Sequence, residues 1–399
     1  MWDEKRKQKF MNKIVLYGTG LEGEKFYCRI SNPNGISYCI DKRNHRYFHN
    51  KYVYSLDEKI DELKECYTVI AAAYQTFLEI RDTLIENGLN EFLDFIHSEL
   101  YEKSKLAIVY GNCHMEKLCE YLRLNYYFSK RYFIRYYYVG EGKAPSDMEL
   151  KSCDLFLTQD IREENDFKMP GAESLMKRLK PDAIKIVIPN LYGCNLFFMQ
   201  SYFPDDEQIK RHLQKHAVDM NGYDPISGQR LRVSAESIGK RDQYIDECYK
   251  NGRSVEEIKG SILNDDIWDE QSILNNFCTQ MEKLKSREEK CDIRISDYIE
   301  RNYHEKLLFY EPFHPSEEII AEKGRRILSM LSIPIEEEIV LSRTLDAMEM
   351  PVYGCVKRAL DLHFDQRILR RQCSSTLLNC SETLDDYIHN YIVWVRENR

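Results

Sequence analysis

Two segments with the same layout constrain the fold of this chain more than any other feature. Each is an apolar run that leads into a glycine-containing turn and then a helical pattern. The first joins Lys13–Tyr17 to Gly18, Gly20 and Gly23, and the second joins Leu106–Tyr110 to Gly111-Asn112-Cys113-His114. Strand-turn-helix units build parallel sheets that bind ligands beyond the carboxyl ends of their strands. We therefore predict an α/β protein with two parallel sheets and a candidate site at each turn.

The first unit predicts a small Rossmann-like module over residues 1–102. Strand-like runs follow it at Ile36–Ile40, Thr68–Ala72 and Phe92–Ile96, and the intervening segments Leu56–Leu63 and Phe77–Glu86 have helical spacing. Alternating strands and helices of this size indicate about half of a complete dinucleotide-binding domain.

The glycines of the first turn predict a nucleotide or nucleotide-sugar site. Gly18, Gly20 and Gly23 have the G-x-G-x-x-G spacing, and Asp41 follows the next strand. In the dinucleotide-binding fingerprint such glycines admit a pyrophosphate and the acid binds a ribose hydroxyl. The same turn also occurs in modules that bind no nucleotide, so the pattern supports the fold more strongly than the ligand.

Residues 103–399 predict a second α/β domain. Strand-like runs recur at 132–139, 154–157 and 184–188, and a charged, mostly helical insertion spans about 205–304. Another apolar run, 307–310, is expected to join the parallel sheet, and a helix is expected over 317–331.

A thiol, an imidazole and a carboxylate are the candidate catalytic groups. Cys113 stands where a helix begins, and the peptide N–H groups at such a point favour an anion. His314 follows the late strand in a loop between two prolines, and Glu311 can orient its ring for general-base work. The alternatives are a buried inert cysteine and an ordinary loop histidine.

Other polar residues are expected around the same sheet edge. Gly111 permits a tight turn and Asn112 can donate to an oxyanion, whereas the ring of His114 should diverge from Cys113 on a helix. Gln159 and Asp160 end another strand and can hold a substrate hydroxyl, although Asp160 also suits a helix cap. Asn190 and Tyr192 belong to a third loop of this edge. His212 and His216 lack the acidic partner of a metal helix, so no metal site is predicted.

Composition excludes several classes of protein. The 399 residues carry a net charge of −9, which argues against nucleic-acid binding. No stretch of about 18 apolar residues suggests a membrane span, and the charged start MWDEKRKQKF lacks a secretory apolar core. The 13 cysteines form no C-x-x-C pair, which favours a reducing, cytoplasmic setting.

From Lys105 to about Phe364 the chain resembles the WcbI-type polysaccharide biosynthesis proteins of bacterial capsule loci. The residues that carry the resemblance occur in the family's order, and they are Val109–His114, Leu157–Ile161, Pro189–Gly193, Asp292–Ile299, Leu308–Ser316 and Met350–Tyr353. The resemblance implies a variant of the SGNH-hydrolase architecture. It places Cys113 at the position of the nucleophile and His314 at that of the histidine, with Glu311 where SGNH enzymes have aspartate.

The resemblance also implies coenzyme A as cofactor and an acyltransferase activity. The expected reaction moves an acyl group, with acetyl as the expected group, from acyl-CoA to a hydroxyl of a surface polysaccharide or its sugar-nucleotide precursor. Two other functions stay open, namely a glycan deacylase and a non-catalytic scaffold that binds a nucleotide sugar. The insertion at 205–304 suits a lid, a docking face or the surface of a homo-oligomer equally well.

Overall fold

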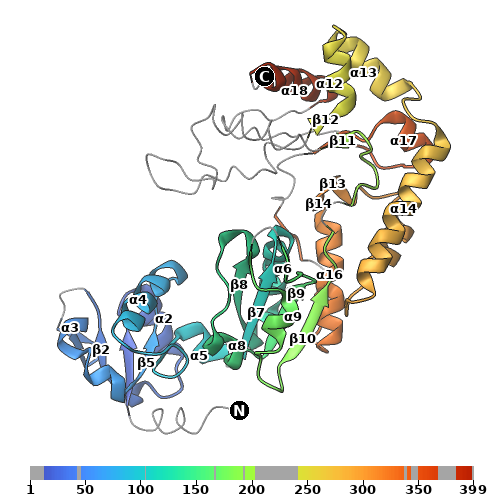
Figure 1. Ribbon diagram of the computed structural model, residues 1–399. Coiled ribbons are helices and arrows are strands. Elements are labelled where there is room, and N and C mark those ends of the chain that lie inside the picture. Colours follow the sequence, from blue (N-terminus) through green and yellow to red (C-terminus); the bar gives the residue numbers. More distant parts are fainter. Residues whose placement is uncertain are drawn as a thin grey trace. The chain divides into compact units, whose positions relative to one another are not determined.

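The computed structural model describes residues 13–42, 46–103, 105–165, 168–191, 194–202, 241–336, 339–342, 349–366 and 383–397 (Figure 1). The chain divides into two compact units. Unit 1 comprises Met1–Met115 and Leu122–Ile186, and unit 2 comprises Glu116–Tyr121 and Val187–Arg399. Among the predicted features, Tyr192, His212, His216 and the start of the insertion, 205–240, lie outside the described residues.

The first sheet of unit 1 is the predicted Rossmann-like sheet. Its order is β3-β4-β2-β1-β5-β6, parallel except where β3 meets β4. The strands are β1 (Ile14–Tyr17), β2 (Ile36–Ile40), β3 (Tyr47–Phe48), β4 (Lys51–Tyr54), β5 (Tyr67–Ile70) and β6 (Phe95–His97). Strands β2 and β5 lie on opposite sides of β1, so the order reverses at its carboxyl end, where the glycine turn stands.

Short helical segments connect these strands. They are α2 (Leu21–Arg29), η1 (Pro33–Gly35), α3 (Leu56–Lys59), η2 (Glu62–Glu65), α4 (Tyr74–Glu86) and α5 (Ser98–Lys103). The single helix expected over 56–63 is therefore two short pieces. Helix α4 ends as expected before Gly88, whose φ of 83° is in the left-handed region.

The second sheet of unit 1 has the order β10-β9-β7-β8. Its strands are β7 (Lys105–Gly111), β8 (Tyr132–Tyr138), β9 (Leu155–Gln159) and β10 (Ile184–Ile188). Strand β7 pairs in parallel with β8 on one side and β9 on the other. The carboxyl end of β7 is thus a second point where the strand order reverses.

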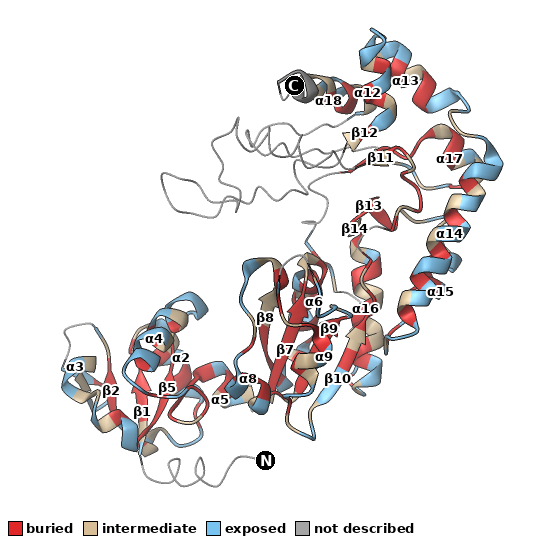
Figure 2. Cartoon of the chain, in the orientation of Figure 1, coloured by how far each residue is buried: buried red, intermediate tan, exposed pale blue. Residues whose placement is uncertain are grey.

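The helices of this second sheet include the one that follows β7. They are α6 (Cys113–Leu124), α7 (Tyr126–Arg131), η3 (Val139–Glu141), α8 (Asp147–Ser152) and α9 (Ala172–Met176). Figure 2 shows β1, β5 and β7 buried almost throughout, as expected for strands whose sequences are continuous apolar runs.

The two sheets share one hydrophobic core, which is why the compact unit extends past the domain boundary predicted at residue 103. Leu16 and Tyr67 of the first sheet belong to the same cluster of buried side chains as Ile108 and Phe156 of the second. A buried ion-pair network adds to this core. Arg135 on β8 pairs with Glu91, from the segment before β6, and its Nη1 lies 2.6 Å from Oε1 of Glu149 on α8.

Unit 2 is mainly helical. Its helices are α12 (Gln243–Lys250), α13 (Val255–Asn264), α14 (Glu270–Glu288), α15 (Ser296–Asn302), α16 (Glu317–Met330), α17 (Gly354–Ala359) and α18 (Leu384–Glu397). The longest, α14, buries residues at helical spacing such as Ile273, Phe277 and Met281 against a core shared with α12, α13 and α18. Two strand pairs complete the unit, β11 (Ser201–Tyr202) with β12 (Arg241–Asp242), and β13 (Phe309–Glu311) with β14 (His314–Pro315).

The prediction that 307–310 joins the parallel sheet is wrong. Strand β13 pairs in antiparallel fashion with β14 in a separate two-stranded sheet. The chain reverses directly after Glu311, where the peptide N–H of Phe313 donates to Oε2 of Glu311 over 2.9 Å. The turn brings the chain straight back onto β13, so β14 becomes its partner.

Candidate functional site

Cys113 is the first residue of α6 and directly follows β7 through a closely packed turn. Its side chain is half-buried. Gly111 must approach its neighbours closely here, since a Cβ at this position would collide with the side chains of Met115 and Gln159. The sequence Gly-Asn-Cys therefore places the thiol at the start of the helix, at the point of the sheet where the strand order reverses.

Hydrogen bonds hold this turn in one conformation. The peptide N–H of Asn112 donates to Oε1 of Gln159 over 2.9 Å, and the N–H of His114 donates to Oδ1 of Asn112 over 3.0 Å. The hydroxyl of Tyr136 donates to the carbonyl of Asn112 over 2.7 Å. Asn112 and Gln159, which were expected to face substrate, use these oxygens to position Cys113. Tyr136 was not predicted, although it lies near the carboxyl end of the neighbouring strand β8, opposite Val109.

His314 and Glu311 face each other across the β13–β14 hairpin. Nδ1 of His314 lies 2.7 Å from Oε1 of Glu311, which is fully buried. The other oxygen of Glu311 accepts the N–H of Phe313, so the carboxylate is fixed on both sides. A carboxylate held in this way sets the orientation of the imidazole.

The hairpin leads into α16, which packs against the central part of α6 within unit 2. A Cβ on Gly324 of α16 would collide with the ring of Tyr121 on α6, so the two helices approach closely there. Lys117 and Glu120 of the same helix both contact Ser342. Helix α6 therefore has its first residues in unit 1 and residues 116–121 in unit 2.

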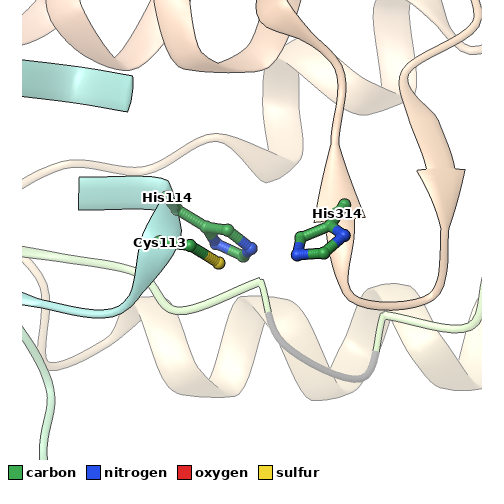
Figure 3. A group of neighbouring side chains, drawn as sticks. All are labelled: Cys113, His114 and His314. Atoms are coloured by element: carbon green, nitrogen blue, oxygen red, sulfur yellow. The ribbon is translucent and has the colours of Figure 1, made fainter. Parts of the chain in front are cut away.

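Figure 3 shows the side chains of Cys113, His114 and His314 directed toward one another. Sγ of Cys113 and one ring nitrogen of each histidine all lie within 4.8 Å of one another. The prediction that His114 diverges from Cys113 is wrong. Cys113 is the first helical residue, and the ring of His114 is long enough to reach the thiol despite the different directions of the two Cα–Cβ bonds.

Asp160 and Asn190 are the other described residues predicted at this edge of the sheet. Asp160 is exposed, and it caps no helix because α9 begins at Ala172 with Gly171 as its N-cap. The carbonyl of Asn190 accepts from Nη1 of Arg287 over 3.2 Å. The neighbouring carbonyl of Pro189 accepts from Nζ of Lys323 over 3.0 Å.

Lys323 is an ionisable residue that the sequence reasoning did not single out. It lies on α16 among buried apolar side chains, and burial lowers its pKa to about 8, an effect that nearby Glu288 partly opposes. The signal was present in the sequence, because Lys323 falls at helical spacing between Ile319 and Ile327 on the apolar face.

The glycine turn of the first sheet is also closely packed. Gly18 has φ of 105°, and a Cβ there would collide with the carbonyl of Ala71, while one on Gly23 would collide with the carbonyl of Gly18. Gly20 is the N-cap of α2. Oδ2 of Asp41 accepts from the N–H and the hydroxyl of Thr19 over 2.7 and 2.6 Å. This oxygen therefore holds the turn, whereas the sequence predicted a ribose contact.

Comparison with known proteins identifies the family. The chain matches the family of the polysaccharide biosynthesis enzyme WcbI over residues 106–336, which is more than half of its length. The chain therefore belongs to the WcbI polysaccharide biosynthesis enzyme family, as the resemblance implied. No curated protein sequence matches it significantly.

One solved structure shares the fold. It is WcbI, described as a novel polysaccharide biosynthesis enzyme, in the native form without a disulfide bond between coenzyme A and a cysteine. The two chains are 16% identical, the match covers 73% of this chain and 90% of that one, and the TM-score is 0.51. At this identity the likeness establishes the fold alone. Within the described ranges, no helix has the length and apolarity needed to cross a bilayer.

Proposed function

We propose that this protein transfers an acyl group, in the first instance acetyl, from acyl-CoA to a hydroxyl of a surface glycan or its sugar-nucleotide precursor. The observation that supports this most is the convergence of Cys113 and a carboxylate-bound His314 at the start of α6. A thiol, a base and a group that orients the base are the parts that acyl transfer through a nucleophile requires. The naming of coenzyme A in the related WcbI structure supports the choice of donor.

In the covalent route, Sγ of Cys113 attacks the thioester carbonyl of acyl-CoA while its proton moves to His314. The bond from the acyl carbon to the CoA sulfur breaks, and the CoA thiolate takes the proton from the imidazolium. The acceptor hydroxyl then attacks the acyl-cysteine, His314 takes the hydroxyl proton, and the Cys113 thiolate leaves and is reprotonated. Exchange between two thioesters is nearly balanced in energy, so the first half-reaction needs no other driving force.

In the direct route, His314 removes the proton of the acceptor hydroxyl, which attacks acyl-CoA itself. Cys113 then only contributes to the surroundings of the oxyanion. The positive end of the α6 dipole, at Cys113, favours the negative charge that develops in either route. The two routes use the same histidine and differ only in whether the thiol carries the acyl group.

Turnover of acetyl-CoA tests the proposal, with UDP-sugars and capsule oligosaccharides as acceptors and release of CoA as the readout. We expect His314→Asn to lower kcat by about 10²–10⁴-fold, the usual contribution of a general base. Cys113→Ala should abolish transfer by the covalent route, and intact-protein mass should show an acetyl group on Cys113 after incubation with acetyl-CoA alone. The exposed Cys278 provides the matched control, Cys278→Ser, which should behave as wild type.

Three outcomes would redirect the proposal. Near-normal turnover of both Cys113→Ala and Cys113→Ser would rule out the covalent route. Loss of acyl groups from an acylated glycan without CoA, together with no transfer from acetyl-CoA, would identify a deacylase. Binding of neither acetyl-CoA nor acylated glycan would favour the scaffold function.

We further propose that the first sheet binds a nucleotide or nucleotide sugar at the turn formed by Gly18, Gly20 and Gly23. The close packing of Gly18 and Gly23 supports this, because it brings the backbone of the turn next to the start of α2. Calorimetric titration of the full chain with NAD and UDP-sugars tests it. Gly20→Val should remove the binding, whereas Gly260→Val, on α13 with open space around its Cβ, should not.

A further inference from the structure

We propose that Cys113, His114 and His314 form a binding site for a transition-metal ion of the zinc class. The three side chains offer one thiol sulfur and two imidazole nitrogens, all within 4.8 Å of one another. Thiolate and imidazole are the ligands that Zn²⁺ prefers in proteins, and they disfavour Mg²⁺ and Ca²⁺. In the part of the chain that the structure describes, no other group of three or more such residues converges in this way.

The distances suit tetrahedral coordination with small side-chain adjustments. With Zn–S near 2.3 Å and Zn–N near 2.0–2.1 Å, neighbouring ligand atoms are about 3.3–3.6 Å apart. The observed limit of 4.8 Å therefore requires shifts of about 1 Å or less for each side chain. Three protein ligands leave the fourth position to water or another small ligand, as in catalytic rather than structural zinc sites.

The surroundings of His314 are those of a metal-binding histidine. Its Nδ1 faces Oε1 of Glu311 at 2.7 Å, which leaves Nε2 as the nitrogen for the metal. Metal-ligating histidines commonly donate their second N–H to a carboxylate, which fixes the tautomer and makes the ligating nitrogen more basic. Glu311 is fully buried and held by a peptide N–H, so this support exists before any metal binds.

The other two ligands are equally well positioned. His114 is almost completely buried, with 1% of its surface exposed, and its backbone is tied to Asn112. Cys113 is fixed by its place as the first residue of α6. Binding requires the thiolate, so uptake of Zn²⁺ releases the Cys113 proton to solvent together with any proton on the two ligating nitrogens.

Metal binding has a consequence that rests on the proposed acyl transfer. The same sulfur cannot ligate Zn²⁺ and carry an acyl group, and the same nitrogen of His314 cannot ligate Zn²⁺ and accept a proton. Bound Zn²⁺ should therefore block transfer, and a chelator should restore it. Metal binding itself needs no substrate, so it is measured independently of the transfer reaction.

Titration of the full-length protein with Co²⁺, after treatment with a chelator, tests the site. Cobalt replaces zinc at such sites and absorbs in the near ultraviolet when bound to a thiolate. We expect one Co²⁺ per chain with this absorption, loss of the absorption in Cys113→Ser, and displacement of the cobalt by Zn²⁺. Glu311→Gln should keep the absorption but weaken Co²⁺ affinity about 10–100-fold, as expected for a group that supports a metal ligand.

The matched controls are Cys278→Ser and His389→Asn, exposed residues of α14 and α18 that lie outside the group. Both should bind Co²⁺ as the wild type does. The proposal is overturned if the absorption is absent, if it persists in Cys113→Ser, or if His314→Asn binds Co²⁺ with unchanged affinity. Transfer activity that fails while the cobalt site forms would refute the proposed function and leave the metal site standing.

Discussion

Substitution of Lys323 by methionine should change how the stability of the protein depends on pH. Burial lowers the pKa of this lysine from 10.5 to about 8. Between these two values the unfolded chain holds a proton that the folded chain does not, so the free energy of unfolding rises with pH. Each pKa unit corresponds to about 1.4 kcal/mol, which gives a total of about 3 kcal/mol across the window.

The sign follows from the direction of the shift. Below pH 8 both states carry the charged lysine, and the folded protein bears the full cost of burying it. As the pH rises toward 10.5 this cost disappears. A methionine side chain at this position has a similar shape without the charge, so the difference in unfolding free energy between wild type and Lys323→Met should move by about 3 kcal/mol in favour of wild type.

Urea unfolding at a series of pH values from 7 to 10.5 measures this difference. Comparison of two variants at each pH cancels the other groups that titrate, and burial holds the neighbouring Cys194 thiol at a pKa of about 11. Lys250, an exposed residue at the end of α12, supplies the control variant Lys250→Met, whose difference from wild type should stay flat. Parallel curves for wild type and Lys323→Met would refute the reasoning, because they would mean that Lys323 titrates normally in the folded protein.

Two further substitutions test the packing that supports the site. Gly324→Ala should lower the free energy of unfolding by about 1–3 kcal/mol through overpacking against Tyr121. The control Gly260→Ala on α13, with open space around its Cβ, should raise it by up to about 1 kcal/mol. Chemical denaturation measures both variants, and equal effects would contradict the close approach of α16 to α6. Arg135→Met should cost about 3–5 kcal/mol, as measured by thermal unfolding, because it removes the buried cation that pairs with Glu149 and leaves Glu91 with Arg81 alone. Its control is Lys177→Met, which removes an exposed ion pair with Glu173 and should leave stability unchanged; a similar loss in both variants would show that the buried network has no special role.

The sheets were predictable because the sequences of buried parallel strands are short apolar runs. Strands β2 and β10 have the predicted bounds, and the runs at 68–72 and 132–139 contain or overlap β5 and β8. The turn after β7 was predictable for a related reason. Glycine and asparagine between an apolar run and a helical pattern mark a change of direction, and Cys113 follows them directly.

The hairpin that carries His314 was not predictable from the same signals. The run at 307–310 is as apolar as the true sheet strands, and nothing local shows whether its partner is parallel or antiparallel. The pairing is decided by the turn that Glu311 stabilises through the N–H of Phe313. The partners of Arg135 and Lys323 are also distant in the sequence. Only the folded chain shows that Arg135 pairs with Glu91 and that Lys323 donates to the carbonyl of Pro189.

Helix α6 is the element on which the candidate site most depends. Its first residue carries the thiol, and its central residues pack against α16, which directly follows His314 in the chain. A helix transmits a shift along its axis because its backbone is hydrogen-bonded throughout. The absence of a side chain at Gly324 therefore matters for the site, because it allows α16 to approach α6 closely. If Gly324→Ala moves α6, transfer and cobalt binding should weaken together, because both need the thiol and the two imidazoles at one point.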